Sequence, residues 1–150
     1  MKNKFGFILI KPQLGENIGA CARSLKNFGC SKLHIVSPKQ SWPNNKAKAT
    51  SVGAYDIIKS AKIYDNTYDA VSDFDIVVSL SARKRDINKK HISINQFLKT
   101  IKSKQDTKFG LMFGPEASGL SNEDLSLSNF VLKIPTSKKF KSLNLSHSLT

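Results

Sequence analysis

The chain has 150 residues, which suits one domain with a real core, and its 24 Lys and Arg against 11 Asp and Glu give a formal net charge of +13. This excess is more than solubility requires and points to a polyanionic partner, although a lysine-rich solvated surface would produce the same count. The opening residues MKNKFGFILIKP hold too few apolar positions for a signal peptide or a membrane span, and Cys21 and Cys30 form no CxxC pair, so a reduced cytoplasmic protein without a membrane segment, zinc or disulfides is expected.

The first predicted elements are a strand over residues 5–10 and a helix from Asn17 to Phe28. Asn17 is a good N-cap residue, and Gly29 is a good residue to follow the helix end. The apolar stripe of this helix consists of Ile18, Ala22, Leu25 and Phe28. Arg23 and Lys26 point away from that stripe.

Further along the chain, residues 33–36 predict a second strand and residues 47–59 a second helix. A very short strand at 63–64 and one or two helical turns over 67–72 follow. The β-branched run DIVVSL, residues 75–80, predicts another strand.

In the last third, Ser93 and Gln96 form a capping box that opens an amphipathic helix. The side chains expected to face inward from this helix are Ile94, Phe97, Leu98 and Ile101. Strands are predicted over 109–113 and 130–134, and Ser121 with Asp124 marks a helix start between them. Strands that alternate with helices indicate an α/β fold, with a mostly parallel sheet covered on both faces.

The stretch FGPEASGLSNEDL, residues 113–125, is a glycine turn between a buried strand and a helix. In α/β sheets this is where ligands bind, at the carboxyl ends of the strands. A phosphate is the usual occupant, but Glu116 would repel it, and neither GxxxxGK[ST] nor GxGxxG is present. A ligand without phosphates is favoured.

Three stretches together resemble the motifs of the SpoU-class RNA 2′-O-methyltransferases of the knotted SPOUT superfamily: NIGACAR at 17–23, FGPEASGL at 113–120 and IPTSKKFKSLNLSHSL at 134–149. The resemblance runs from residue 5 to the end of the chain. In addition, SARKR at 81–85 is similar to a segment of the branch that methylates the first nucleotide of the tRNA anticodon loop, position 32.

The resemblance implies a C-terminal trefoil knot, a homodimer, and S-adenosylmethionine as the methyl donor. The implied cofactor-binding residues are Leu80, Ser81, Ala82, Gly114, Gly119, Ile134, Ser142, Leu143 and Asn144. The residues implied around the reacting ribose are Asn17, Arg23, Glu116, Ser142 and Asn144. The implied RNA-binding residues are Arg83, Arg85, Lys138, Lys139 and Lys141. Residues 1–150 would form one SpoU-type domain that lacks the end of its last helix and any C-terminal extension.

Simpler roles remain open for two of these residues. Glu116 could brace its own loop by accepting bonds from backbone N–H groups, and Asn17 could be a plain helix cap. Arg23 is the family's candidate base, but a guanidinium is ordinarily not deprotonated in a protein, so a clamp on the adjacent phosphate is the preferred role. The alternatives are a methyltransferase for rRNA or another tRNA position, an inactive RNA-binding relative, and a Rossmann-type oxidoreductase, which would need a glycine fingerprint that is missing here.

Overall fold

A seven-stranded sheet organises the chain. The computed structural model describes residues 4–27, 29–30, 32–81, 90–115 and 118–133. The strands are β1 (Lys4–Ile10), β2 (Leu33–Val36), β3 (Lys62–Tyr64), β4 (Ile76–Ser81), β5 (Lys90–Ile92), β6 (Lys108–Phe113) and β7 (Phe130–Lys133). The helices are α1 (Gly15–Asn27), α2 (Asn45–Ser51), the 3-10 helix η1 (Val52–Ala54), α3 (Tyr55–Ser60), α4 (Thr67–Val71), α5 (Ile94–Ser103) and α6 (Asn122–Ser126).

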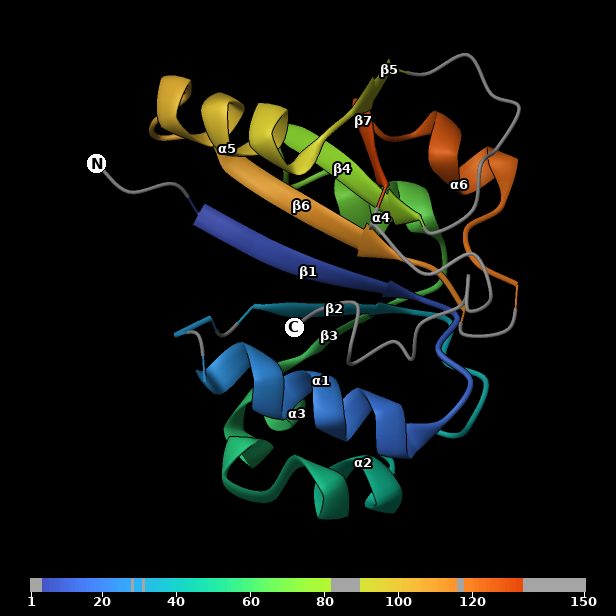
Figure 1. The fold of residues 1–150 in the computed structure, drawn as a ribbon. Coiled ribbons are helices and arrows are strands. Elements are labelled where there is room, and N and C mark those ends of the chain that lie inside the picture. Colours follow the sequence, from blue (N-terminus) through green and yellow to red (C-terminus); the bar gives the residue numbers. More distant parts are fainter. Residues whose placement is uncertain (1–3, 28, 31, 82–89, 116–117, 134–150) are drawn as a thin grey trace, which may run out of the picture.

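The sheet has the strand order β3-β2-β1-β6-β4-β7-β5 (Figure 1), and all the described pairings are parallel. Parallel strands need crossover connections, and helices supply them between successive strands other than β4 and β5, whose connection lies outside the described residues. The predicted α/β class with a mostly parallel sheet is therefore confirmed. No helix in the described part of the chain is long and apolar enough to cross a bilayer.

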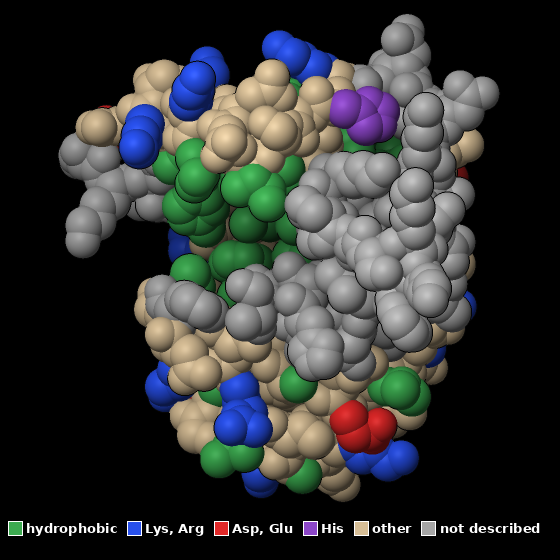
Figure 2. All heavy atoms as spheres, viewed as in Figure 1, with side chains coloured by type: hydrophobic (Ala, Val, Ile, Leu, Met, Phe, Trp, Pro, Cys, Tyr) green, Lys and Arg blue, Asp and Glu red, His purple; other side chains and the backbone are tan. Residues whose placement is uncertain are grey.

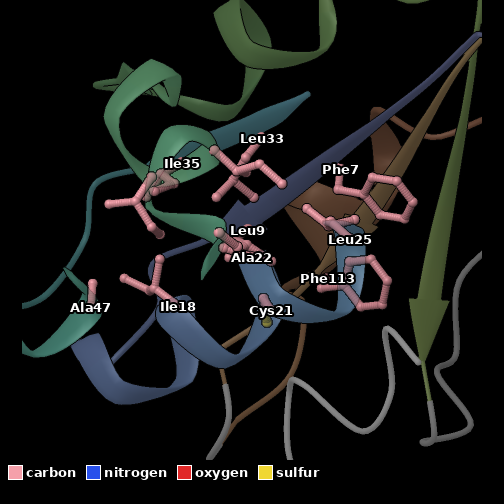
Figure 3. Close-up of a cluster of buried hydrophobic side chains, with 13 residues drawn as sticks. Phe7, Leu9, Ile18, Cys21, Ala22, Leu25, Leu33, Ile35, Ala47 and Phe113 are labelled. Atoms are coloured by element: carbon pink, nitrogen blue, oxygen red, sulfur yellow. The ribbon is translucent and has the colours of Figure 1, made fainter. Parts of the chain in front are cut away.

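Alternating side chains of β6 show how the two faces of the sheet are covered. Phe113 packs with α1 and the neighbouring strands in one cluster (Figure 3), and Phe109 meets Phe97 of α5 edge-on at 6.2 Å between ring centroids. Met112 points to the opposite face, where α4 and α6 contribute Val71 and Leu125 to a second cluster. Helices therefore cover both faces, as predicted.

The ends of α1 match the prediction at one terminus only. The helix begins at Gly15, because the N–H groups of Asn17 and Ile18 already donate to the carbonyl of Leu14, at 3.2 and 3.4 Å. Asn17 therefore lies in the first turn, and the prediction that it is the N-cap is wrong. Gly29 has φ +74 and donates to the carbonyl of Lys26, while Cys30 donates to that of Leu25, the Schellman pattern expected after a helix end.

The single helix predicted over 47–59 is wrong, because the chain breaks it at Val52. That residue has φ 51 and ψ −117, a conformation that ends α2 and starts the short 3-10 helix before α3. Helical spacing of apolar residues on both sides conceals the break, since Ala47 and Ile57 are both buried in the same cluster.

Helix α5 carries the predicted capping box, in which Ser93 accepts a bond from the N–H of Gln96 and the side chain of Gln96 accepts one from the N–H of Ser93. Its apolar face is less covered than predicted, because Ile94 and Leu98 are 46% and 49% exposed. Figure 2 shows hydrophobic side chains open on this side of the molecule, next to α5. The prediction that Ile94 and Leu98 face the interior is therefore wrong for the described part of the chain.

Candidate functional site

The carboxyl ends of three neighbouring strands meet where the sequence places its candidate ligand site. In the register of the sheet, Leu80 of β4 lies opposite both Phe113 of β6 and Leu132 of β7. The segments that follow these strands therefore leave the sheet side by side. Ligands of parallel α/β sheets bind at this edge, which we call the carboxyl edge.

The turn after β6 is closed tightly on itself. A Cβ atom on Gly114 would lie 2.3 Å from the backbone nitrogen of Leu120, so only glycine fits there. Gly119 has φ +70, which favours glycine, and its N–H donates to the carbonyl of Pro115 at 2.9 Å. Leu120 is 2% exposed and anchors the end of the turn in the core. Both candidate glycines thus have structural reasons for their identity.

A side-chain hydrogen bond connects α6, the helix after this turn, to the start of α4. Ser121 caps α6 by accepting a bond from the N–H of Asp124, as predicted. The carboxylate of Asp124 accepts a bond of 2.7 Å from the hydroxyl of Thr67 at the start of α4. In the sequence, Asp124 is recognisable only as part of a helix start, so this contact with Thr67 was not predicted.

Beside this contact is a cavity of about 480 Å³. Tyr68, which is 69% exposed, and Lys11 contribute to its walls together with Asn66 and Thr67. Asn66 caps α4 by accepting a bond from the N–H of Asp69. None of these residues belongs to a motif quoted above, and no sequence signal would have grouped them.

The candidate residues of α1 lie on different sides of the helix. Asn17 is half-buried in the first turn, just after the carboxyl end of β1, whereas Arg23 is exposed and points away from the buried stripe. Asn17 and Arg23 are six residues apart, and at 100° per residue their side chains point in clearly different directions around the helix axis. Within the described part of the chain, Arg23 makes no hydrogen bond or ion pair.

The structure thus brings together Leu80, Ser81, Gly114 and Gly119 at the carboxyl edge, with Asn17 near the adjacent end of β1. The candidates that lie outside the described residues are Ala82, Arg83, Arg85, Glu116, Ile134, Lys138, Lys139, Lys141, Ser142, Leu143 and Asn144. The described histidines, His34 on β2 and His91 on β5, are on none of the three loops. Among the described residues, no group of three or more His, Cys, Asp and Glu could hold a metal ion.

Comparison with known proteins gives a consistent picture. The model of the SpoU rRNA methylase family matches residues 4–150. A relative from Methanocaldococcus jannaschii, the tRNA (cytidine-2'-O-)-methyltransferase TrmJ, is 37% identical over 95% of this chain and 62% of its own length. The crystal structure of TrmJ from Z. mobilis superposes with a TM-score of 0.89, at 35% identity, over 96% of this chain and 64% of that one.

A more distant structure shares the fold. The SpoU methyltransferase AviRb from Streptomyces viridochromogenes, solved in complex with AdoMet, has a TM-score of 0.76 at 18% identity, over 99% of this chain and 55% of that one. The chain spans about three fifths of the length of the curated relatives that it matches first.

Proposed function

The chain belongs to the SpoU rRNA methylase family, and from this premise we propose that it transfers a methyl group from S-adenosylmethionine to a ribose 2′-hydroxyl of tRNA. The observation that carries the proposal is the meeting of β4, β6 and β7 at one edge, because the SARKR, FGPEASGL and IPTSKKF segments follow these strands. The name of the M. jannaschii relative supports tRNA as the substrate. We place the target at position 32 of the anticodon loop and the enzyme in the cytoplasm.

The described part of the proposed cofactor site suits a molecule with apolar parts and no phosphates. Leu80 is half-buried at the end of β4, and Gly114 and Gly119 have no side chains, so their backbone groups can approach a ligand closely. Bound there, S-adenosylmethionine would supply an electrophilic methyl group. The other residues that we assign to this site are Ser81, Ala82, Ile134, Ser142, Leu143 and Asn144.

The protein's task in such a transfer is to orient the ribose oxygen in line with the methyl group and to stabilise the charge that develops on it. We assign Arg23 to clamp the adjacent phosphate in a bidentate contact, which also places positive charge beside the forming alkoxide. Asn17, Glu116, Ser142 and Asn144 would position the ribose. Proton removal is left to water or to Arg23 itself.

We further propose a homodimer and a C-terminal trefoil knot. The exposure of Arg23 supports a shared site, because an exposed guanidinium that forms no ion pair with a described residue can approach a second copy across a two-fold axis. The knot would involve residues 134–150, which lie outside the described part of the chain.

The RNA would meet a basic surface made by Arg83, Arg85, Lys138, Lys139 and Lys141. Contacts of this kind are electrostatic, so they hold the backbone of RNA and carry little sequence information. The choice of nucleotide must then come from the pocket that receives the ribose and its base.

The decisive experiment is mass spectrometry of nucleosides from tRNA incubated with the protein and isotopically labelled S-adenosylmethionine. We expect one labelled 2′-O-methylnucleoside, which disappears when the target nucleotide carries a 2′-deoxy substitution. Methyl groups on a base, or label that persists in the deoxy-substituted tRNA, would contradict the assignment. Label on rRNA alone would show the rRNA alternative, and cofactor and RNA binding without label would show an inactive relative.

A further inference from the structure

A second cavity, of about 510 Å³, opens at the amino ends of the strands, on the opposite edge of the sheet from the candidate site. Its volume is in the range of small-molecule sites, roughly 300 to 1,000 Å³. Lysines surround it: β3 and β6 begin with Lys62 and Lys108, and Lys32 immediately precedes β2. We call this cavity the amino-edge pocket.

The pocket has an aromatic floor. Gly6 of β1 and Gly110 of β6 are register partners, and a Cβ on either would lie 2.3 or 2.8 Å from the ring of Phe74. The two glycines therefore leave a flat recess in the sheet that the ring of Phe74 fills. His34 meets Phe74 edge-on at 5.2 Å between centroids and stacks on Tyr64 at 5.5 Å.

The charge of the pocket is positive. Lys32, Lys62 and Lys108 are exposed and form no ion pair with another described residue, and Asp73 is the one acidic side chain of the lining. Burial and the nearby Lys62 lower the pKa of His34, against the opposing effect of Asp73. His34 is therefore neutral at pH 7 and adds a hydrogen-bonding group to the floor without adding charge; its Nδ1 lies 3.0 Å from the hydroxyl of Tyr64.

We propose that the amino-edge pocket binds a nucleotide unit, with its phosphate among Lys32, Lys62 and Lys108 and its base against Phe74 and His34. Ammonium groups without carboxylate partners bind phosphate oxygens through charge-assisted hydrogen bonds, and a base offers a flat face to an aromatic wall. Two sources supply this chemistry: a free nucleotide, and a nucleotide within a bound RNA. The inference is independent of methyl transfer, which takes place at the other edge of the sheet.

Titration calorimetry of the full chain with adenosine 5′-monophosphate, adenosine and inorganic phosphate tests the proposal. We expect the monophosphate to bind at one site, at least about tenfold more tightly than adenosine or phosphate alone, since only it engages both parts of the pocket. The double variant Lys32→Gln with Lys62→Gln should weaken this binding about tenfold or more. Lys59→Gln, at an exposed lysine of α3 outside the pocket, is the matched control and should leave it unchanged.

Nuclear magnetic resonance locates the ligand. The imidazole signal of His34 should shift on addition of the monophosphate, and its titration midpoint should rise because a bound anion favours the imidazolium. Displacement of the monophosphate by tRNA, with weaker tRNA binding in the double variant, would identify the RNA source; simultaneous binding of both would identify a free nucleotide. Absence of binding at millimolar monophosphate, equal binding by the double variant, or an unshifted His34 signal would overturn the proposal.

Discussion

Gly114 and Leu120 approach each other so closely that a Cβ atom on the former would lie 2.3 Å from the backbone nitrogen of the latter. The obstacle is backbone rather than the end of a flexible side chain, so it cannot move aside without moving the turn. This turn follows β6 at the proposed cofactor site. A substitution that disturbs the packing of the turn should therefore also weaken ligand binding.

Replacement of Gly114 by alanine should open the turn. We expect affinity for S-adenosylmethionine to fall at least about tenfold, and the free energy of unfolding to fall by about 1–3 kcal/mol, the usual cost of overpacking. Calorimetry with the cofactor and urea denaturation measure the two effects. Gly53→Ala is the control, because a Cβ there meets nothing within 4 Å. Native affinity in the Gly114 variant would show that the turn does not hold the cofactor.

Replacement of Arg23 by alanine should slow methyl transfer more than it weakens binding. We expect single-turnover rates to fall about a hundredfold or more, as when a preorganised charge is lost, with tRNA and cofactor affinities within about tenfold of native. Lys26→Ala is the matched control on the same helix, since Lys26 bonds Asp56 at 3.1 Å and the carbonyl of Gly53 at 2.9 Å. Equal rates for the Arg23 and Lys26 variants would show that Arg23 has no role in the reaction.

Mixed dimers should reveal whether two chains share one site. Arg23→Ala and Asn144→Ala chains, each nearly inactive alone, should recover part of the native activity when they are mixed and exchanged, because one of the two sites in a mixed dimer then contains neither substitution. Sedimentation velocity establishes the dimer under the same conditions. A monomer that is fully active at nanomolar concentration would rule the shared site out.

Stability should decline as pH falls below neutrality because of His34. Its pKa in the folded chain is lowered, chiefly by burial, so the unfolded state binds more protons as pH falls through the ordinary histidine value of about 6.5. The stabilisation that comes from His34 is present above the ordinary histidine pKa, and it is lost progressively as the pH falls toward the lower pKa of the folded state. Urea denaturation at pH 7.5 and 5.5 should show a smaller loss in His34→Gln than in the native chain.

Val52 should be replaceable by glycine with a gain in stability. It is 67% exposed with φ 51, so its side chain contributes little packing while its backbone is in a region that costs about 1–3 kcal/mol for such residues. We expect Val52→Gly to raise the free energy of unfolding by roughly 1 kcal/mol, after the entropy lost by glycine. Val52→Ala retains a Cβ and should gain much less. A destabilised glycine variant would mean that the valine side chain has a packing role.

Strands with several buried apolar residues were predictable from the sequence, because burial dictates composition directly. Residues 5–10, 33–36 and 109–113 were assigned correctly for this reason. Strand β5 was missed, since Lys90-His-Ile contributes one buried side chain and its pairing among the described strands is with β7 alone, at the edge of the sheet. A strand of that kind is specified by its neighbour rather than by its own pattern.

The spacing of apolar residues correctly indicated where helices form. It was less informative about where each helix begins and about what packs against its apolar face. Apolar residues spaced three and four positions apart located α1, but the hydrogen bonds accepted by the carbonyl of Leu14 determined its start. In α5 this spacing identified an apolar face without showing what covers it, and Ile94 and Leu98 remain exposed among the described residues. For the candidate site, the sequence supplied the residue types, while the pairing of β4 with both β6 and β7 supplied the reason that their loops meet.

The recess that holds Phe74 also limits which substitutions can occur together, both in evolution and in a designed library. Three positions far apart in the chain, 6, 74 and 110, share one volume, so a methyl group added at either glycine requires a smaller side chain at 74. Selection of folded variants from a library randomised at these positions should therefore yield linked substitutions, with the sum of the three side-chain volumes nearly constant. Single substitutions at any of the three would be recovered less often than their compensated pairs.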